Sequence, residues 1–147
     1  MPTRSARTAW NGDLMSGSGQ VELTSSGAGT FDVNFPKRAA DEADGTTSPE
    51  ELVAGAHSAC YAMSLSNLLA EAGATIHSLD VTADVTLGPD KEAGGFMLTG
   101  ITLTARGEIE GVDDAGFKEA AEKAKAGCPI SKALTGVEIT LDAALES

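Results

Sequence analysis

An uncharged stretch in the middle of the chain limits what this sequence can fold into. No residue from 52 to 70 carries a formal charge. Ser48 and Pro49 precede the stretch, and Gly73 follows it. Serine before the first turn, proline in it and glycine after the last turn are typical helix boundaries. The sequence therefore predicts a helix from Pro49 to Ala72.

This predicted helix suits the interior of a protein better than a membrane. About 24 helical residues span about 36 Å, which is enough to cross a bilayer. However, the stretch contains His57, Asn67 and several small polar residues. We therefore predict a central helix that is buried on most sides, and no membrane association. One small sheet cannot cover such a helix, so we expect part of it to be buried in a homodimer.

Alternating apolar residues on both sides of this helix predict strands. Other boundary signals predict two later helices, the first capped by Asp113 and ending at Ala126, and the second opened by Pro129 and ending at Leu134. The predicted strands are Ala6–Trp10, Val21–Leu23, Phe31–Phe35, Leu79–Leu87, Met97–Ile109 and Val137–Leu145, with a hairpin connection at 88–95.

The predicted element order is β-β-β-α-β-β-α-α-β. Strands in blocks, without regular β-α-β alternation, are typical of the α+β class. We therefore predict antiparallel sheets packed on a long buried central helix. A chain of 147 residues has the size of one ordinary domain, so we expect a single domain over 1–147.

Charge and the N-terminal sequence exclude several classes of function. The chain has 22 acidic and 10 basic residues and a formal charge of −12, so we expect no nucleic-acid binding, which needs clustered Lys and Arg. The first 13 residues carry Arg4 and Arg7 without an apolar segment after them. We expect a cytoplasmic protein, in which two cysteines are inert, catalytic or redox-active more often than permanently bridged.

Cys60 and Cys128 are the two cysteines. Cys60 lies deep in the predicted central helix, where burial raises the pKa of a thiol and the helix N-terminus is too distant to lower it. An inert, packed thiol is the ordinary interpretation of such a position. Cys128 lies between a helix end and Pro129, where free N–H groups favour a thiolate, although a small residue also suits a tight junction.

A reactive Cys60 therefore requires a neighbouring cation. Only four arginines are present, and Arg38 lies in the polar loop predicted at 37–47, which leads into the central helix. Glu51 is explained as part of a capping box with Ser48, whereas Glu50 is free to orient an arginine. Glu50 and Cys60 are about 15 Å apart along one helix, so a partner subunit would have to bring them together.

Two histidines complete the candidate residues. His57 lies three residues before Cys60, so a Cys-His pair or, with Cys128, a zinc site is conceivable. The sequence has neither CxxC nor HxxxH spacing, and we interpret His57 as a core residue. His77, at the start of a strand, receives no function. We expect no metal and no other cofactor.

Two segments resemble one known family. Residues 47–63 read TSPEELVAGAHSACYAM, and residues 123–131 read KAKAGCPIS. Together they resemble the osmotically inducible protein C and organic hydroperoxide resistance (OsmC/Ohr) family, and the OsmC branch more than the Ohr branch. The resemblance implies a homodimer of intertwined subunits with both active sites at the interface.

The resemblance also implies a thiol-dependent peroxidase of the oxidative stress response. Cys60 would attack the hydroperoxide and become a sulfenic acid, Cys128 would resolve it as a disulfide, and Arg38 and Glu50 would activate Cys60. Lys37, Arg4 and Arg7 compete with Arg38 for that role. An external thiol or dithiol would reduce the disulfide, and apolar Leu52, Tyr61 and Met63 would suit an organic peroxide.

Two alternatives remain open at this point. One is a redox sensor or thiol-binding module that forms the same disulfide without turnover. The other is a structural or ligand-binding dimer with inert cysteines. The sequence does not identify the preferred peroxide or the physiological reductant.

Overall fold

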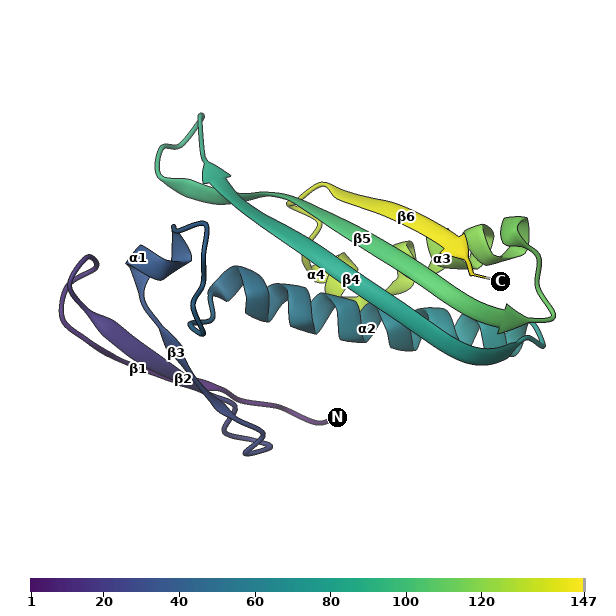
Figure 1. Ribbon diagram of the computed structural model, residues 1–147, viewed down its shortest axis with the longest axis horizontal. Helices are drawn as coiled ribbons and strands as arrows, with labels where there is room; N and C mark the ends of the chain where they lie inside the picture. The colour runs from purple at the N-terminus through teal and green to yellow at the C-terminus, as the bar shows by residue number, and fades with distance from the viewer. Residues whose placement is uncertain (147) are drawn as a thin grey trace. The chain divides into compact units, whose positions relative to one another are not determined.

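The computed structural model describes residues 1–146 and divides into two compact units, Met1–Leu52 and Val53–Ser147 (Figure 1). The boundary between the units falls within the long helix α2, Pro49–Glu71. The single domain expected over 1–147 stays a prediction.

Three short strands form the sheet of the first unit. They are β1 (Arg7–Asn11), β2 (Ser18–Glu22) and β3 (Thr30–Val33), paired antiparallel in that order. Val21 is opposite Thr8 on one side and Phe31 on the other. The short alternating runs predicted these three strands correctly, because each run is bounded by glycine and serine turns.

A short helix, α1 (Phe35–Arg38), follows β3. The prediction that Phe35 belongs to the third strand and that Lys37 begins a loop was wrong here. The Asn34 side chain accepts a hydrogen bond from the Lys37 N–H at 2.8 Å, and Pro36 lies in the first turn. An Asn N-cap followed by an early proline starts a helix, and Arg38 consequently lies at the end of an ordered element.

Helix α2 begins and ends where its boundary signals predicted. The Ser48 Oγ accepts a hydrogen bond from the Glu51 N–H at 3.1 Å, and Gly73 has φ +83°, a conformation that favours glycine. Within 1–146, no helix combines the length and apolarity that a membrane crossing requires.

The second unit contains a three-stranded sheet in the order β4 (Thr75–Pro89), β5 (Phe96–Glu110), β6 (Ile139–Leu145). Strands β4 and β5 are antiparallel, as predicted. Strand β6 runs parallel to β5, because α3 (Asp114–Gly127) and α4 (Pro129–Ala133) connect them. A crossover of this length returns the chain to the same end of the sheet.

The core of this unit lies between one face of the sheet and helices α2 and α3. From α2 it takes a stripe of buried residues at four-residue spacing, which lie on one side of a helix. Met63, off this stripe, is 73% exposed, and Met97 of β5 is 39% exposed in the single chain. The central cluster contains Tyr61, Leu65, Leu69, Leu103, Ala105, Phe117, Ala121, Ala124 and Cys128.

Replacing Leu65 with alanine is expected to lower the free energy of unfolding by about 3 kcal/mol, because Leu65 is fully buried and its removal leaves a cavity. Denaturant unfolding followed by circular dichroism measures this change. Asn67→Ala, on the exposed side of the same helix, is the control and should cost less than about 0.5 kcal/mol. Equal losses in the two variants would contradict the assigned core.

Candidate active site

The two cysteines, 68 positions apart in the sequence, meet in the second unit. Cys60 comes from the middle of α2, and Cys128 from the junction of α3 and α4. Both are free thiols, and each side chain influences the pKa of the other, so the two lie close together. Cys128 is fully buried, whereas Cys60 keeps part of its surface exposed. Only Cys60 is therefore open to a molecule from solvent.

Cys128 occupies a position that favours negative charge. Burial raises the pKa of its thiol, but the backbone N–H of Ser131, the Cys60 thiol, the Ser131 hydroxyl and the backbone N–H of Ile130 together lower it below its ordinary value. The Cys128 side chain makes no capping hydrogen bond, so the dipoles of these groups, and not a cap, lower the pKa of the thiol. The N-cap position that the sequence indicated is confirmed.

Cys60 has the opposite environment. Burial raises the pKa of its thiol, and the neighbouring Cys128 raises it further. The backbone N–H of Ile130 and the side chain of Ser64 lower it only in part. With these neighbours alone, Cys128 is the more acidic of the two thiols. An added positive charge would lower the pKa of Cys60 and favour its thiolate.

Arg38 and Glu50 form an ion pair in the first unit. The Arg38 Nε lies 3.1 Å from both Glu50 carboxylate oxygens, and one terminal nitrogen lies 2.7 Å from Oε1. Burial raises the pKa of Glu50, but the hydrogen bonds and charge of Arg38 outweigh it and hold that pKa below its usual value. Glu50 thus orients Arg38 within one chain.

Two of the three other cations named as competitors have different partners. Lys37 forms an ion pair with Asp44, and Arg4 donates to the Thr3 carbonyl oxygen. The Arg38–Glu50 pair belongs to the first unit and the Cys60–Cys128 pair to the second. The expectation that a partner subunit unites Glu50 with Cys60 stays a prediction.

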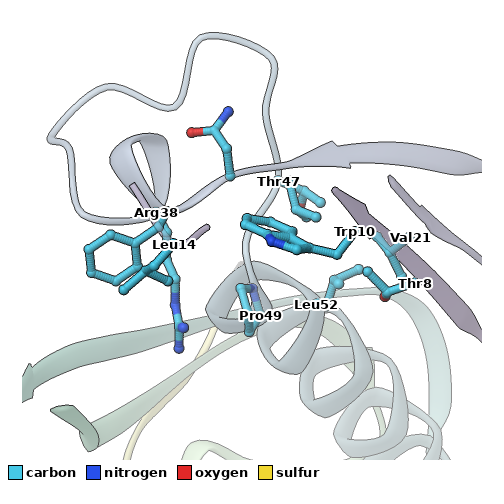
Figure 2. A pocket seen from close by; sticks show the side chains of 11 residues that line it. Thr8, Trp10, Leu14, Val21, Arg38, Thr47, Pro49 and Leu52 are labelled. Carbon is cyan, nitrogen blue, oxygen red and sulfur yellow. The ribbon is translucent and has the colours of Figure 1, made fainter. Parts of the chain in front are cut away.

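An apolar cavity of about 490 Å³ opens in the first unit. Figure 2 shows Trp10, Leu14 and Leu52 lining it together with Arg38. Leu52, Tyr61 and Met63 were expected to suit an organic peroxide, and Leu52 is the one among them that lines this cavity. Tyr61 instead belongs to the core, where its hydroxyl donates to the Ala121 carbonyl at 2.9 Å. No sequence signal pointed to Trp10, because it lies on a short strand far along the chain from the helix that carries the motif.

His57 is fully buried and contacts a serine, not a cysteine. Its Nε2 lies 2.7 Å from the Ser131 Oγ. No three His, Cys, Asp or Glu side chains are grouped to hold a metal in the described part of the chain. His77 pairs with Glu110 at the surface. Ser131 was quoted in the second motif but received no role, since nothing local links it to a residue 74 positions away.

Comparison with known proteins agrees with the two motifs. The model of the family described as OsmC-like protein matches residues 41–142. Peroxiredoxin OsmC of Escherichia coli K12 is 44% identical over 138 residues, which cover 94% of this chain and 93% of that protein. Peroxiredoxin OsmC of Shigella flexneri matches equally well.

Solved structures agree as well. An organic hydroperoxide resistance protein from Elizabethkingia anophelis is 31% identical, with a TM-score of 0.81 over 99% of this chain and 98% of that one. The organic hydroperoxide resistance protein OhrB of Bacillus subtilis is 28% identical, with a TM-score of 0.75 over 95% of this chain and 97% of that one.

Glu50→Gln is expected to lower the free energy of unfolding at pH 7 by about 1 kcal/mol, since Arg38 loses its charged partner while a third of its side chain is exposed. The folded-state pKa of Glu50 lies below the unfolded one. The stabilisation is therefore complete above the unfolded pKa and is lost as the pH falls through the folded pKa.

The measurement is denaturant unfolding of both proteins from pH 7 down to about pH 3. The difference between wild type and Glu50→Gln should shrink on acidification. Glu110→Gln, which disrupts an exposed pair, is the control and should change stability little. A difference that is constant over the whole pH range would contradict the ion pair's assigned role.

Proposed function

This chain belongs to the OsmC family, and we propose that it reduces organic hydroperoxides, with Cys60 attacking the peroxide and Cys128 resolving the product as a disulfide. Its relatedness to Peroxiredoxin OsmC and to the hydroperoxide resistance proteins makes it a cysteine-based peroxidase. The observation that carries the proposal is the pair of neighbouring free thiols, one partly exposed and one buried.

In the first proposed step, the Cys60 thiolate attacks the terminal oxygen of the hydroperoxide. The O–O bond breaks, sulfur is oxidised to a sulfenic acid, and the alkoxide leaves and takes up a proton to become an alcohol. Arg38 is proposed to favour the thiolate and to stabilise the leaving alkoxide. Its orientation by Glu50 supports this role.

In the second proposed step, Cys128 attacks the Cys60 sulfenic acid. A disulfide forms, and the hydroxide that leaves takes up a proton to become water. The contact between the two side chains supports this step, since a disulfide needs close approach. An external thiol or dithiol then returns both cysteines to the reduced state. We propose a cytoplasmic location, because that compartment supplies such reductants.

A homodimer is also part of the proposal. Only one stripe of α2 is buried in the single chain, and apolar side chains such as Met63, Trp10 and Phe31 are at least 40% exposed. Exposed apolar surface of this kind is typical of interfaces between subunits. The cavity beside Arg38 has a size and apolar lining that suit the organic part of a peroxide.

Cys60→Ser is expected to abolish the consumption of cumene hydroperoxide in the presence of dithiothreitol, because no sulfenic acid can form at residue 60. Without dithiothreitol, Cys128→Ser should still consume one equivalent and accumulate a sulfenic acid that dimedone traps, as mass spectrometry would detect. If wild-type protein is oxidised to the disulfide but does not turn over with any monothiol or dithiol, the chain is a redox sensor and the enzymatic proposal fails.

Arg38→Met is expected to lower the second-order rate constant of Cys60 with hydroperoxide at pH 7 by about 100-fold, which corresponds to about 3 kcal/mol of lost thiolate and alkoxide stabilisation. Stopped-flow rates from pH 5 to 9 would show activity recovering at higher pH, as more thiolate forms without the cation. Lys37→Met is the matched control. A loss in Lys37→Met instead would assign the role to the neighbouring lysine.

A further inference from the structure

A buried histidine next to the cysteine pair takes no part in the steps described so far. His57 has no exposed surface, and Ser131, its hydrogen-bond partner, is 5% exposed. Burial lowers the pKa of His57, so the ring is neutral near pH 7. A neutral imidazole has one N–H donor and one acceptor nitrogen, and the surroundings decide which nitrogen carries the proton.

The hydrogen-bonding partners fix the tautomer. Nε2 lies 2.7 Å from the Ser131 Oγ, while Nδ1 has no hydrogen-bond partner among residues 1–146. A buried N–H without an acceptor is rarer and costlier than an acceptor without a donor. The proton therefore belongs on Nε2, which donates to the Ser131 hydroxyl oxygen.

Ser131 then directs its own proton toward sulfur. The hydroxyl oxygen accepts from His57, so its O–H remains to be donated. The same side chain interacts with Cys128 and lowers the pKa of that thiol. Ser131 lies in the first turn of α4, three positions after Cys128 at the N-cap, and this spacing places its hydroxyl and its N–H on the side of the turn that faces the Cys128 side chain. Successive hydrogen bonds in one direction strengthen one another.

We propose that His57 and Ser131 form a buried hydrogen-bond relay, His57 Nε2–H to Ser131 Oγ–H to Cys128 Sγ, that holds Cys128 as the thiolate which attacks oxidised Cys60. His57 and Ser131 are positioning residues for the resolving step, and the inference rests on the proposed function. In that step a Cys128 electron pair forms the S–S bond, the S–O bond of Cys60 breaks, and its electron pair leaves with hydroxide.

Other ionisable groups surround the relay. Cys60 and Tyr61 of α2 act on Cys128. Glu122, Lys125 and Lys132 line the surface depression where Ser131 lies. A test must therefore keep all five positions identical in every pair of proteins that it compares, so that a change in the titration of Cys128 is caused by the relay.

The test uses full-length protein and four variants. Ser131→Ala removes the relay hydroxyl, and His57→Leu removes the ring donor. His57→Gln retains an N–H near the position of Nε2. Ser58→Ala is the matched control, because Ser58 lies on α2 but bonds to its own helix, at the Gly55 carbonyl. Circular dichroism verifies that each variant is folded, and Ser131→Ala, the smallest change, keeps the test decisive if His57→Leu does not fold.

The first readout separates the two chemical steps. One equivalent of cumene hydroperoxide is mixed with reduced protein, and quenched samples are analysed by mass for sulfenic acid, trapped with dimedone, and for disulfide. We expect disulfide formation to slow by about tenfold in Ser131→Ala and His57→Leu, the loss of one hydrogen bond to a charged group. The rate of disulfide formation should return to the wild-type value in His57→Gln and remain at that value in Ser58→Ala. Cys60 should continue to consume peroxide in all four variants.

The second readout is the ultraviolet absorbance of the Cys128 thiolate, titrated in a Cys60→Ser background. The midpoint should move to higher pH when Ser131→Ala or His57→Leu is added, which a merely structural role for these residues would not cause. Unchanged midpoints and wild-type resolution rates in both variants overturn the relay. If wild-type Cys60 is not oxidised by peroxide, the proposed function fails, while the thiolate titration still decides whether the relay exists.

Discussion

The second unit depends on one stripe of side chains along α2, in which a buried residue recurs every four positions. His57, Tyr61, Leu65 and Leu69 have no exposed surface, and such spacing keeps them on one side of the helix. Packing of this stripe against Leu103 and Phe117 fixes the rotation of α2 about its axis. Cys60 is next to Tyr61 in sequence, so the same rotation determines that its sulfur meets Cys128 and remains partly exposed.

The first turn of α4 decides which thiol of the pair is the more acidic. Both sulfurs are desolvated, which disfavours either thiolate. The pair is made unequal by the first turn of α4, whose N–H groups and Ser131 hydroxyl act on Cys128. The helix junction therefore stabilises a thiolate at a sulfur that solvent does not reach. Cys60, which solvent does reach, obtains no comparable help from the second unit.

The sequence predicted those features that local signals specify. Ser48, Pro49 and Gly73 defined α2 to within one residue, because a cap acts only on adjacent backbone. The direction of β6 could not be predicted, because apolar and polar residues alternate in the same way in parallel and antiparallel strands. The crossover through α3 and α4 determines that β6 runs parallel to β5. Helix α1 was overlooked because it has four residues and no periodicity.

In the candidate site, too, only the features that local sequence signals specify were predictable. Cys128 at an N-cap followed from Pro129, whereas its pairing with Cys60 came from the family resemblance and not from spacing. The bidentate contact between Arg38 and Glu50 agrees with the argument that Glu50, unlike Glu51, was free to orient an arginine. The link between His57 and Ser131 spans 74 positions and depends on tertiary packing, which no local pattern encodes.

Access and charge together account for the order of events in the proposed mechanism. If pKa alone decided reactivity, Cys128 would attack the peroxide, because its thiol is the more acidic of the two. Its complete burial prevents that encounter. The partly exposed Cys60 meets the peroxide once a cation overcomes its raised pKa, and the sulfenic acid then forms beside the more acidic thiol of the pair. The sulfur that is easier to ionise is thus reserved for the second step, because a peroxide from solvent can reach only the other one.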